Sequence, residues 1–223
     1  MDITHVIGTR FNIGKGTNTD WTQYRGKLLR QFAARSVQMQ VTPPTLWAIL
    51  VDARTPDDVL KPIIADLPCT VFKTNKRPGG WAKDLADWLR ERVRTEWMSF
   101  TRLDSDDALH PLYIADIAKA VRPRREILTF RGGLVVRVER MEAHRLMKTN
   151  TSFQTTIEQT AKAKTGYCAG HGKLPTLFPT RVLQSFPRWL VVRHERNERR
   201  TGKYPFPRAH PGELQAHFGF LFR

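Results

Sequence analysis

The chain has 223 residues, with 37 Lys and Arg against 21 Asp and Glu, so its formal net charge is +16. Hydrophobic residues make up 40% of the sequence, enough for a buried core, which excludes a disordered polycation. The length predicts one domain over residues 1–223.

Two cysteines, Cys69 and Cys168, are too few for a disulfide framework, which favours a reducing compartment. The N-terminus lacks a secretory signal pattern, and no 18 apolar residues follow one another. We therefore expect a cytoplasmic protein without a transmembrane segment, whose basic surface also allows peripheral attachment to a membrane.

The first half alternates strand-like and helix-like segments. Apolar runs predict strands at 3–8, 46–51, 69–72 and 99–103. Helical spacing predicts helices at 20–34, capped by Asp20, and at 81–97, and Thr55 caps a third that starts at Pro56. This order predicts an α/β fold with a mostly parallel central sheet and helices on both faces.

The second half predicts a different arrangement. The segments expected are a hairpin of 127–130 and 134–139 around Arg131-Gly132-Gly133, a strand at 141–147, a helix at 155–164, a buried segment at 189–193, an exposed Arg-rich loop at 193–208 and a helix at 211–220. No Asp follows Asp116, so carboxylate chemistry in this half must come from Glu.

Polar residues follow three of the four strands of the first half. They are Thr9, Arg10 and Asn12 after the first strand, Asp52 after the second, and Asp104, Asp106 and Asp107 after the fourth. Because ligands of such sheets bind beyond the carboxyl ends of the strands, these positions predict a binding site.

The three aspartates repel one another unless a cation neutralises them, and Mg²⁺ or Mn²⁺ binds through one or two carboxylates together with substrate phosphates. The alternative is that they cap a helix that begins near His110, which accounts for one of them but not for three.

The segment from Arg102 to Leu109 resembles the Asp-x-Asp-Asp strand end of family-2 glycosyltransferases with the GT-A nucleotide-sugar fold. Residues 6–12 and 48–52 resemble the first two strands of that fold, in the same order. The sequence is most similar to the putative rhamnosyltransferase group. The residues that show this similarity are Thr9 to Asn12, Trp21, Arg25, Phe32, Asp52 and Thr55-Pro56. The resemblance covers residues 1–112.

The resemblance implies a metal-dependent, inverting transfer of a sugar from a nucleotide-sugar donor to an acceptor hydroxyl. It places Thr9, Arg10 and Asn12 in the donor-binding loop and Asp52 on the base or ribose. Asp104 would contact the ribose or the metal, and Asp106 would bind the metal, Mn²⁺ or Mg²⁺, which assists departure of the diphosphate.

The second half departs from the family-2 pattern because it lacks the usual Asp base. The segment Phe153 to Glu158 resembles one used by the rhamnosyltransferase group, which makes Glu158 the candidate base; an exposed helical Glu is the alternative. The stretch from Trp189 to Asn197 resembles that group's Trp…His-x-x-Asn segment. It implies His194 as a metal or diphosphate ligand, with a structural histidine after an apolar strand as the alternative, and Arg193 and Asn197 as acceptor or phosphate contacts. His171, flanked by Gly170 and Gly172, is a further candidate contact, and a plain turn is its alternative.

The positive charge is concentrated in the second half. Residues 1–120 hold 17 basic and 14 acidic side chains, a net charge of +3, and residues 121–223 hold 20 and 7, a net charge of +13. We therefore divide the domain into a nucleotide-sugar-binding half, 1–112, and a basic acceptor-side half, 113–223. A solvated basic face explains the charge, as do three polyanionic acceptors: nucleic acid, an acidic glycan or a lipid-linked glycan at a membrane.

Two other classes of function fit parts of the sequence. A nucleic-acid-binding protein or metal-dependent nuclease would use the aspartates for metal and the basic half for the backbone, but it has no need of the Thr-Arg-Phe-Asn turn. A non-catalytic sugar-binding module would explain the missing Asp base.

Overall fold

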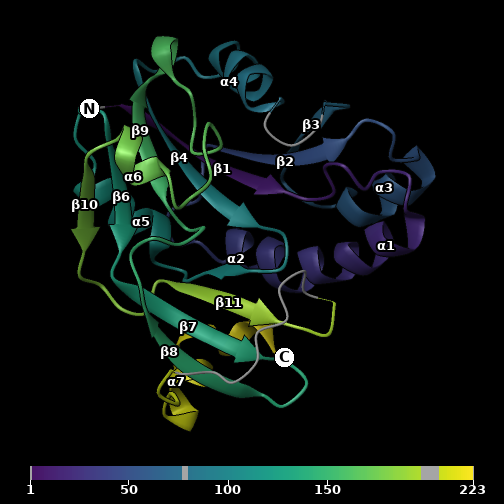
Figure 1. Cartoon of the computed structure of the whole chain (residues 1–223), viewed down its shortest axis with the longest axis vertical. Helices are drawn as coiled ribbons and strands as arrows, with labels where there is room; N and C mark the ends of the chain where they lie inside the picture. Colours follow the sequence, from purple (N-terminus) through teal and green to yellow (C-terminus); the bar gives the residue numbers. More distant parts are fainter. Residues whose placement is uncertain (1, 77–79, 197–205, 223) are drawn as a thin grey trace.

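The computed structural model describes residues 2–76, 80–196 and 206–222. A seven-stranded sheet forms its larger part (Figure 1), in the order β10-β6-β9-β4-β1-β2-β3. Its strands are β1 Ile3–Arg10, β2 Leu46–Asp52, β3 Thr70–Thr74, β4 Trp97–Asp104, β6 Glu126–Phe130, β9 Thr155–Gln159 and β10 Thr180–Leu183.

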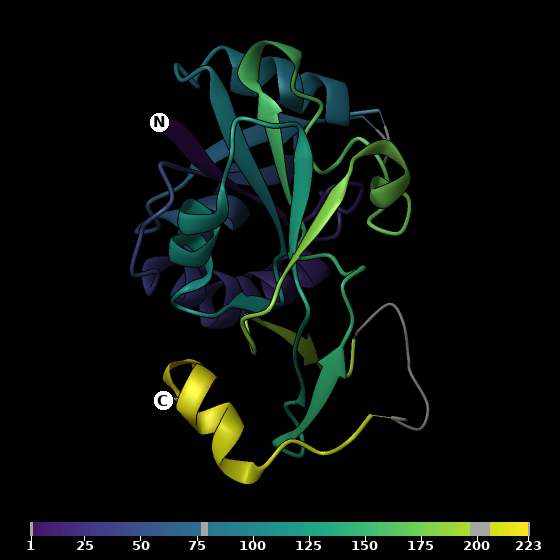
Figure 2. The ribbon, with the colours of Figure 1, turned by 90° about the vertical axis from the view of Figure 1, so that its left-hand side faces the viewer.

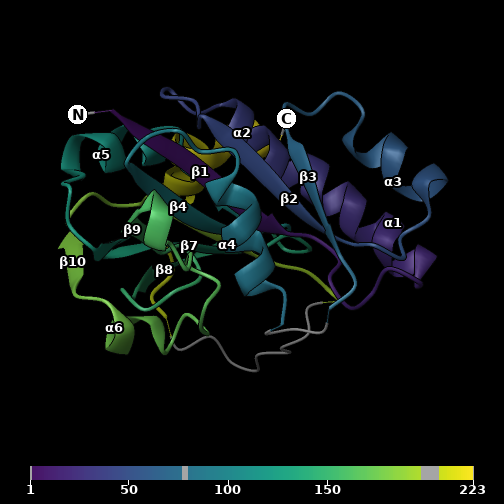
Figure 3. The ribbon, with the colours of Figure 1, turned by 90° about the horizontal axis from the view of Figure 1, so that it is seen from above.

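The four neighbouring strands β1 to β4 run parallel, and so do β6 and β10, whereas β9 is antiparallel to both of its neighbours. Helices cover both faces: α1 Thr19–Leu28, α2 Arg35–Gln38 and α3 Asp57–Ile64 lie on one side and α4 Ala82–Arg90 on the other (Figure 3). The predicted α/β fold with a mostly parallel central sheet is therefore confirmed.

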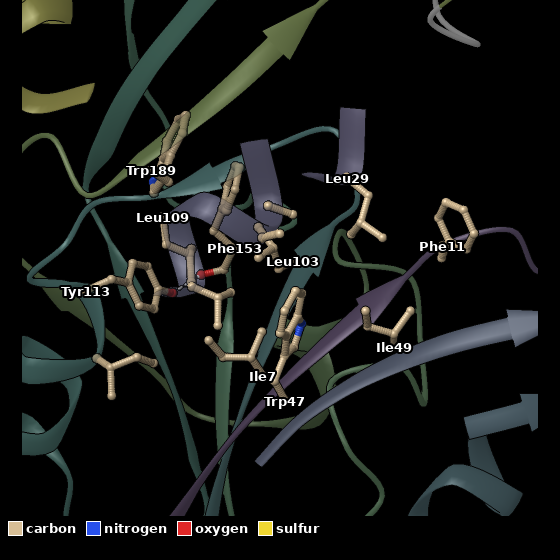
Figure 4. Close-up of a cluster of buried hydrophobic side chains, with 14 of the residues drawn as sticks. Ile7, Phe11, Leu29, Trp47, Ile49, Leu103, Leu109, Tyr113, Phe153 and Trp189 are labelled. Carbon is tan, nitrogen blue, oxygen red and sulfur yellow. Dashed lines mark hydrogen bonds between the residues drawn. The ribbon is translucent and has the colours of Figure 1, made fainter. Parts of the chain in front are cut away.

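Each face of the sheet has its own apolar core. One core packs Ile7, Trp47 and Ile49 against α2, α3, the π-helix Leu29–Ala34 that connects α1 to α2, and α5 Tyr113–Ala120 (Figure 4). The other packs Val6, Leu50 and Phe100 against α4. Strand residues therefore alternate between two buried faces, and the strands are apolar throughout, as expected of a covered parallel sheet.

A second, four-stranded sheet lies below the first with α7 Pro211–Phe218 packed against it (Figures 1 and 2). Its order is β5-β11-β7-β8, formed by Ala108–Leu109, Trp189–Arg193, Gly132–Arg137 and Glu142–Met147. The predicted hairpin around Arg131 is wrong, because β6 belongs to the first sheet and β7 to the second. β7 pairs with β8 and β11 instead.

Two further local predictions are corrected. Residues 155–159 form the central strand β9 rather than a helix, because Thr155, Thr156 and Ile157 are β-branched and pair with β4 and β6. The helix expected at 81–97 ends at Arg90.

The helix caps also differ from those expected. Asn18, not Asp20, caps α1. Thr55 does not cap α3, because its hydroxyl donates to the Asp52 carbonyl. The Arg-rich loop lies partly at 197–205, outside the described residues.

No helix within the described ranges is long and apolar enough to cross a membrane.

Candidate functional site

The carboxyl ends of β1, β2 and β4 meet at one edge of the large sheet, which we call the carboxyl edge. Strand register aligns Arg10 with Asp104 and with Leu50, two residues before Asp52. Arg10 Nη2 lies 3.8 Å from Asp104 Oδ1, and both side chains are partly exposed. These two groups are therefore available to a ligand at the edge.

Thr9 and Asn12 organise this edge from within rather than face it. Thr9 is fully buried and its hydroxyl accepts a hydrogen bond from Trp47 Nε1 (2.9 Å). The Asn12 amide accepts from the Asp52 backbone N–H (3.0 Å) and donates to the Thr55 hydroxyl (2.7 Å). The polar atoms of both side chains are thus engaged inside the protein, and a donor contact by either residue stays a prediction.

Asp52 holds the loop that follows β1. Its carboxylate accepts two hydrogen bonds from the Arg54 guanidinium (2.7 and 2.9 Å) and one from the Gly14 N–H (2.9 Å). These hydrogen bonds, from Arg54 first, lower the pKa of Asp52 well below its usual range. A Cβ on Gly16 would lie 2.7 Å from the Asp52 side chain, so glycine is required there. Arg54, which the sequence interpretation missed, is half-exposed and presents its charge at the edge.

The three aspartates after β4 have separate partners. Asp104 faces Arg10. Asp107 is buried and accepts a hydrogen bond from the Val192 backbone N–H (2.9 Å), which ties the turn to β11. Burial, together with the charges of Asp106 and Asp104, raises the pKa of Asp107 well above its usual value. Asp107 therefore links the large sheet to the second sheet.

Asp106 lies at the centre of a buried polar cluster. Its carboxylate accepts hydrogen bonds from both terminal nitrogens of Arg25 (2.5 and 2.8 Å), and its Oδ2 lies 3.1 Å from His194 Nε2. Tyr24 Oη contacts the other ring nitrogen of His194 at 2.9 Å. Burial would raise the pKa of Asp106, but the His194 hydrogen bond and the Arg25 guanidinium outweigh it and hold that pKa below the usual range.

This cluster brings together two predicted metal-binding residues, Asp106 and His194, 88 positions apart in the sequence. Arg25 and Tyr24 were not predicted as site residues. Arg25 falls in the buried stripe of α1, and a charge in such a stripe requires a buried partner. That was the signal available in the sequence.

Glu158 does not reach the carboxyl edge. It pairs in register with Met98, six residues and therefore roughly 20 Å before Asp104 on β4. Its two oxygens accept the backbone N–H groups of Lys164 and Thr165 (2.9 Å each), and burial raises its pKa. The exposed-helix alternative is wrong, because Glu158 is a buried strand residue. Its position closes the turn after β9 and gives no support to a role as the acceptor base.

The remaining predicted contacts are spread over the second half. Arg193 ends β11 opposite Arg137. His171 lies in the turn before α6 Leu174–Leu177. Asn197 lies outside the described residues.

A metal would find a carboxylate and an imidazole at Asp106 and His194, and Asp104 nearby in sequence. In the described part of the chain no three His, Cys, Asp or Glu side chains converge on one point. Two protein ligands fit an ion that takes its other ligands from a diphosphate and water. Arg25 occupies the same carboxylate, so an ion there has to share or displace the guanidinium.

A family model described as "Putative rhamnosyl transferase" matches residues 17–204. No curated protein matches the chain. Among solved structures, S. aureus TarS 1-349 in complex with UDP is similar with a TM-score of 0.50 at 16% identity, covering 86% of this chain and 60% of that one. S. aureus TarS gives a TM-score of 0.50 at 15% identity, covering 86% of this chain and 37% of that one. The chain thus spans less than two thirds of either, and the likeness is one of fold.

Proposed function

The chain belongs to the putative rhamnosyl transferase family, and from that membership we propose that it transfers a sugar from a nucleotide-sugar donor bound at the carboxyl edge to an acceptor hydroxyl. The family confirms the resemblance found in the motifs and the expected enzyme class, a glycosyltransferase. The observation that carries the proposed site is that Arg10, Asp104 and the Asp106–His194 pair come to one edge of the sheet. A structure of the same fold in complex with UDP supports the choice of donor.

Arg10 and Arg54 are the exposed cations suited to phosphate oxygens, because a guanidinium donates two parallel hydrogen bonds to such a group. Asp104 is the exposed carboxylate suited to a ribose hydroxyl. Asp52 positions Arg54 and the Gly14 turn and acts through them.

Asp106 and His194 would hold the divalent ion, Mn²⁺ or Mg²⁺, with Asp104 as the further candidate. When bound, the ion supplies Lewis-acid neutralisation of the departing diphosphate. Tyr24 orients the His194 ring by its contact with Nδ1, and this leaves Nε2 toward Asp106. An inverting outcome is part of the proposal by family resemblance.

We also propose that the acceptor binds to the basic second half of the chain, residues 113–223, and that it is a polyanion. The nuclease alternative is not favoured, because the aspartates after β4 are shared among Arg10, Arg25 and Val192 instead of forming one acidic site.

The test is calorimetric titration with UDP, dTDP and GDP, in Mn²⁺ and in EDTA. We expect one of them to bind with Mn²⁺, and Asp106→Asn to weaken that binding at least tenfold. Asp116→Asn is the matched control, since Asp116 also forms a mostly buried ion pair with an arginine, Arg188, but on α5. No binding of any of the three, or equal loss in both variants, would overturn the proposed donor site.

A further inference from the structure

Arg102, on β4, is a buried arginine whose charge has no carboxylate partner. It is 7% exposed, and no Asp or Glu of the described residues forms an ion pair with it. By contrast, Arg25 and Arg188, whose side chains are each 13% exposed, are both paired with an aspartate. A buried charge is costly unless opposite charge or hydrogen bonds compensate it, and Arg102 has only neutral groups to do so.

These neutral groups hold the guanidinium and leave one of its edges unused. Nη1 donates to the backbone carbonyls of Gly166 (3.1 Å) and Ala169 (3.3 Å), in the segment after β9. The Tyr167 ring lies against the guanidinium, with its centroid 4.6 Å from Cζ. Nε is enclosed without a hydrogen-bond partner, and within the described part of the chain Nη2 has none either. The Nε and Nη2 edge is one that binds a carboxylate or a phosphate through two parallel hydrogen bonds.

Gln154 places further unpaired polar atoms beside Arg102. Its carbonyl accepts the Arg102 backbone N–H (3.2 Å), which extends the pairing of β4 with β9 by one residue. Residues directly opposite each other on antiparallel strands share a face, with their Cβ atoms about 5 Å apart. Gln154 is fully buried, and neither its amide oxygen nor its amide nitrogen has a hydrogen-bond partner. Two neighbouring buried side chains therefore present unpaired polar atoms on one face of the sheet.

The pair lies on the face of the sheet that carries Arg10 and Asp104. Side chains two residues apart on a strand share a face, so Arg102 precedes Asp104 on β4 by roughly 6.6 Å. The strand register aligns Gly8 with Arg102 and Arg10 with Asp104. Tyr167 Oη donates to the Gly8 carbonyl (2.9 Å), which holds its ring at the depth of Arg102. An anion at Arg102 would therefore lie just inside the carboxyl edge, next to the groups assigned to the donor.

We propose that Arg102 binds an oxyanion of the sugar donor through Nε and Nη2, with the Gln154 amide as a further donor; this role rests on the proposed function. Two oxyanions of such a donor fit, a phosphate of the diphosphate or a carboxylate on the sugar, because each accepts two parallel hydrogen bonds. Either one compensates the buried charge. The Gly166 and Ala169 carbonyls keep the guanidinium oriented, and the Gln154 side chain, which no hydrogen bond holds, can rotate as the anion enters.

The test is calorimetric titration of the full chain with UDP, pyrophosphate, UDP-glucose and UDP-glucuronate in Mg²⁺. Arg102→Lys keeps the charge but not the two-pronged edge. If the anion is a phosphate, this variant should weaken UDP and pyrophosphate by about tenfold or more, the loss of one charge-assisted hydrogen bond. If it is a sugar carboxylate, UDP binding should be unaffected, wild type should prefer UDP-glucuronate over UDP-glucose by about tenfold, and Arg102→Lys should remove that preference. Neither pattern would overturn the proposal.

Two further variants separate anion binding from structure. Gln154→Met removes unpaired buried atoms, so we expect it to keep or raise the melting temperature while weakening the same ligand; unchanged affinity would overturn the Gln154 contact. It also carries the test if Arg102→Lys fails to fold. Arg90→Met is the matched control, since Arg90 also donates to a carbonyl after β9, that of Ala163 (3.0 Å), but is paired with Asp87.

Arg90→Met should leave all four affinities unchanged. Equal losses in Arg90→Met and Arg102→Lys would mean that both arginines only anchor the segment after β9, which overturns the anion site. Pyrophosphate, which has no nucleoside, keeps this proposal apart from the proposed function. Pyrophosphate binding that depends on Arg102, without binding of any nucleoside diphosphate, would overturn the donor site and leave the anion site standing. Equal UDP binding by wild type and Arg102→Lys, without a preference for UDP-glucuronate, would do the reverse.

Discussion

Three buried carboxylates of the seven-stranded sheet, Asp52 and Asp106 at the carboxyl edge and Glu158 at the other end, are compensated by different means. At the carboxyl edge, Asp52 and Asp106 are paired with side-chain cations, Arg54 and Arg25. At the other end, Glu158 accepts two backbone N–H groups. The first kind of partner lowers the pKa of the carboxylate, whereas the pKa of Glu158 stays raised by burial.

We expect this difference to separate the proposed donor site from a purely structural contact. A guanidinium can reorient toward a phosphate when a ligand binds, because its side chain is flexible and a single carboxylate does not occupy all of its N–H donors. Backbone N–H groups in a turn cannot move without unfolding it. Ligand exchange is therefore expected at Asp106 and Asp52 and not at Glu158.

The largest expected effect comes from removing the cation at Asp106. Arg25→Met leaves a buried carboxylate without its bidentate partner, and we expect a loss of about 3–5 kcal/mol in the free energy of unfolding. Urea denaturation measures it. If side-chain pairing at this end serves ligand binding as well, the folded fraction should also lose nucleoside diphosphate binding.

Arg188→Met is its matched control. Arg188 Nε lies 2.6 Å from Asp116 Oδ2, and the exposure of the arginine equals that of Arg25. It should cost similar stability and spare nucleotide binding. Equal loss of nucleotide binding in both variants would mean that the Arg25–Asp106 pair is purely structural, and that it does not differ in function from the Glu158 contact.

The second effect is at Glu158. In Glu158→Gln an amide NH₂ replaces one oxygen and faces a backbone donor, which costs about 1–3 kcal/mol. Sugar transfer by the folded variant should continue. A variant that folds and binds donor but fails to transfer would restore Glu158 as the base.

The raised pKa of Glu158 adds a pH dependence with a defined sign. Between its ordinary value of 4.5 and the raised value, the folded state binds more protons than the unfolded state. The stabilisation is complete below pH 4.5 and is lost as pH rises through the folded pKa. The stability gap between wild type and Glu158→Gln should therefore narrow from pH 4 to pH 7 in urea titrations.

The carboxyl edge was predictable because β1, β2 and β4 each combine an apolar run with a polar end, and parallel strands bring such ends together. The pairing of His194 with Asp106 was suggested only by family resemblance. Glu158 was misplaced because local spacing does not distinguish a short helix from a central strand, and the partners β4 and β6 decided it. The hairpin failed because nothing local shows that the chain changes sheets at Arg131.

The smallest effect in stability concerns Arg10, whose pair with Asp104 is exposed and long at 3.8 Å. Arg10→Ala should change the free energy of unfolding by less than about 1 kcal/mol. Yet its guanidinium is placed to meet the donor, so we expect UDP binding to weaken about tenfold, the loss of one charge-assisted hydrogen bond of about 1.5 kcal/mol. Arg92→Ala removes a similarly exposed arginine that pairs with Glu91 and lies over the Trp88 ring; it should also change stability by no more than about 1 kcal/mol and leave UDP binding unchanged. Calorimetry with UDP compares the two variants. Equal UDP affinities of the two variants would mean that the exposed Arg10 at the carboxyl edge does not bind the diphosphate.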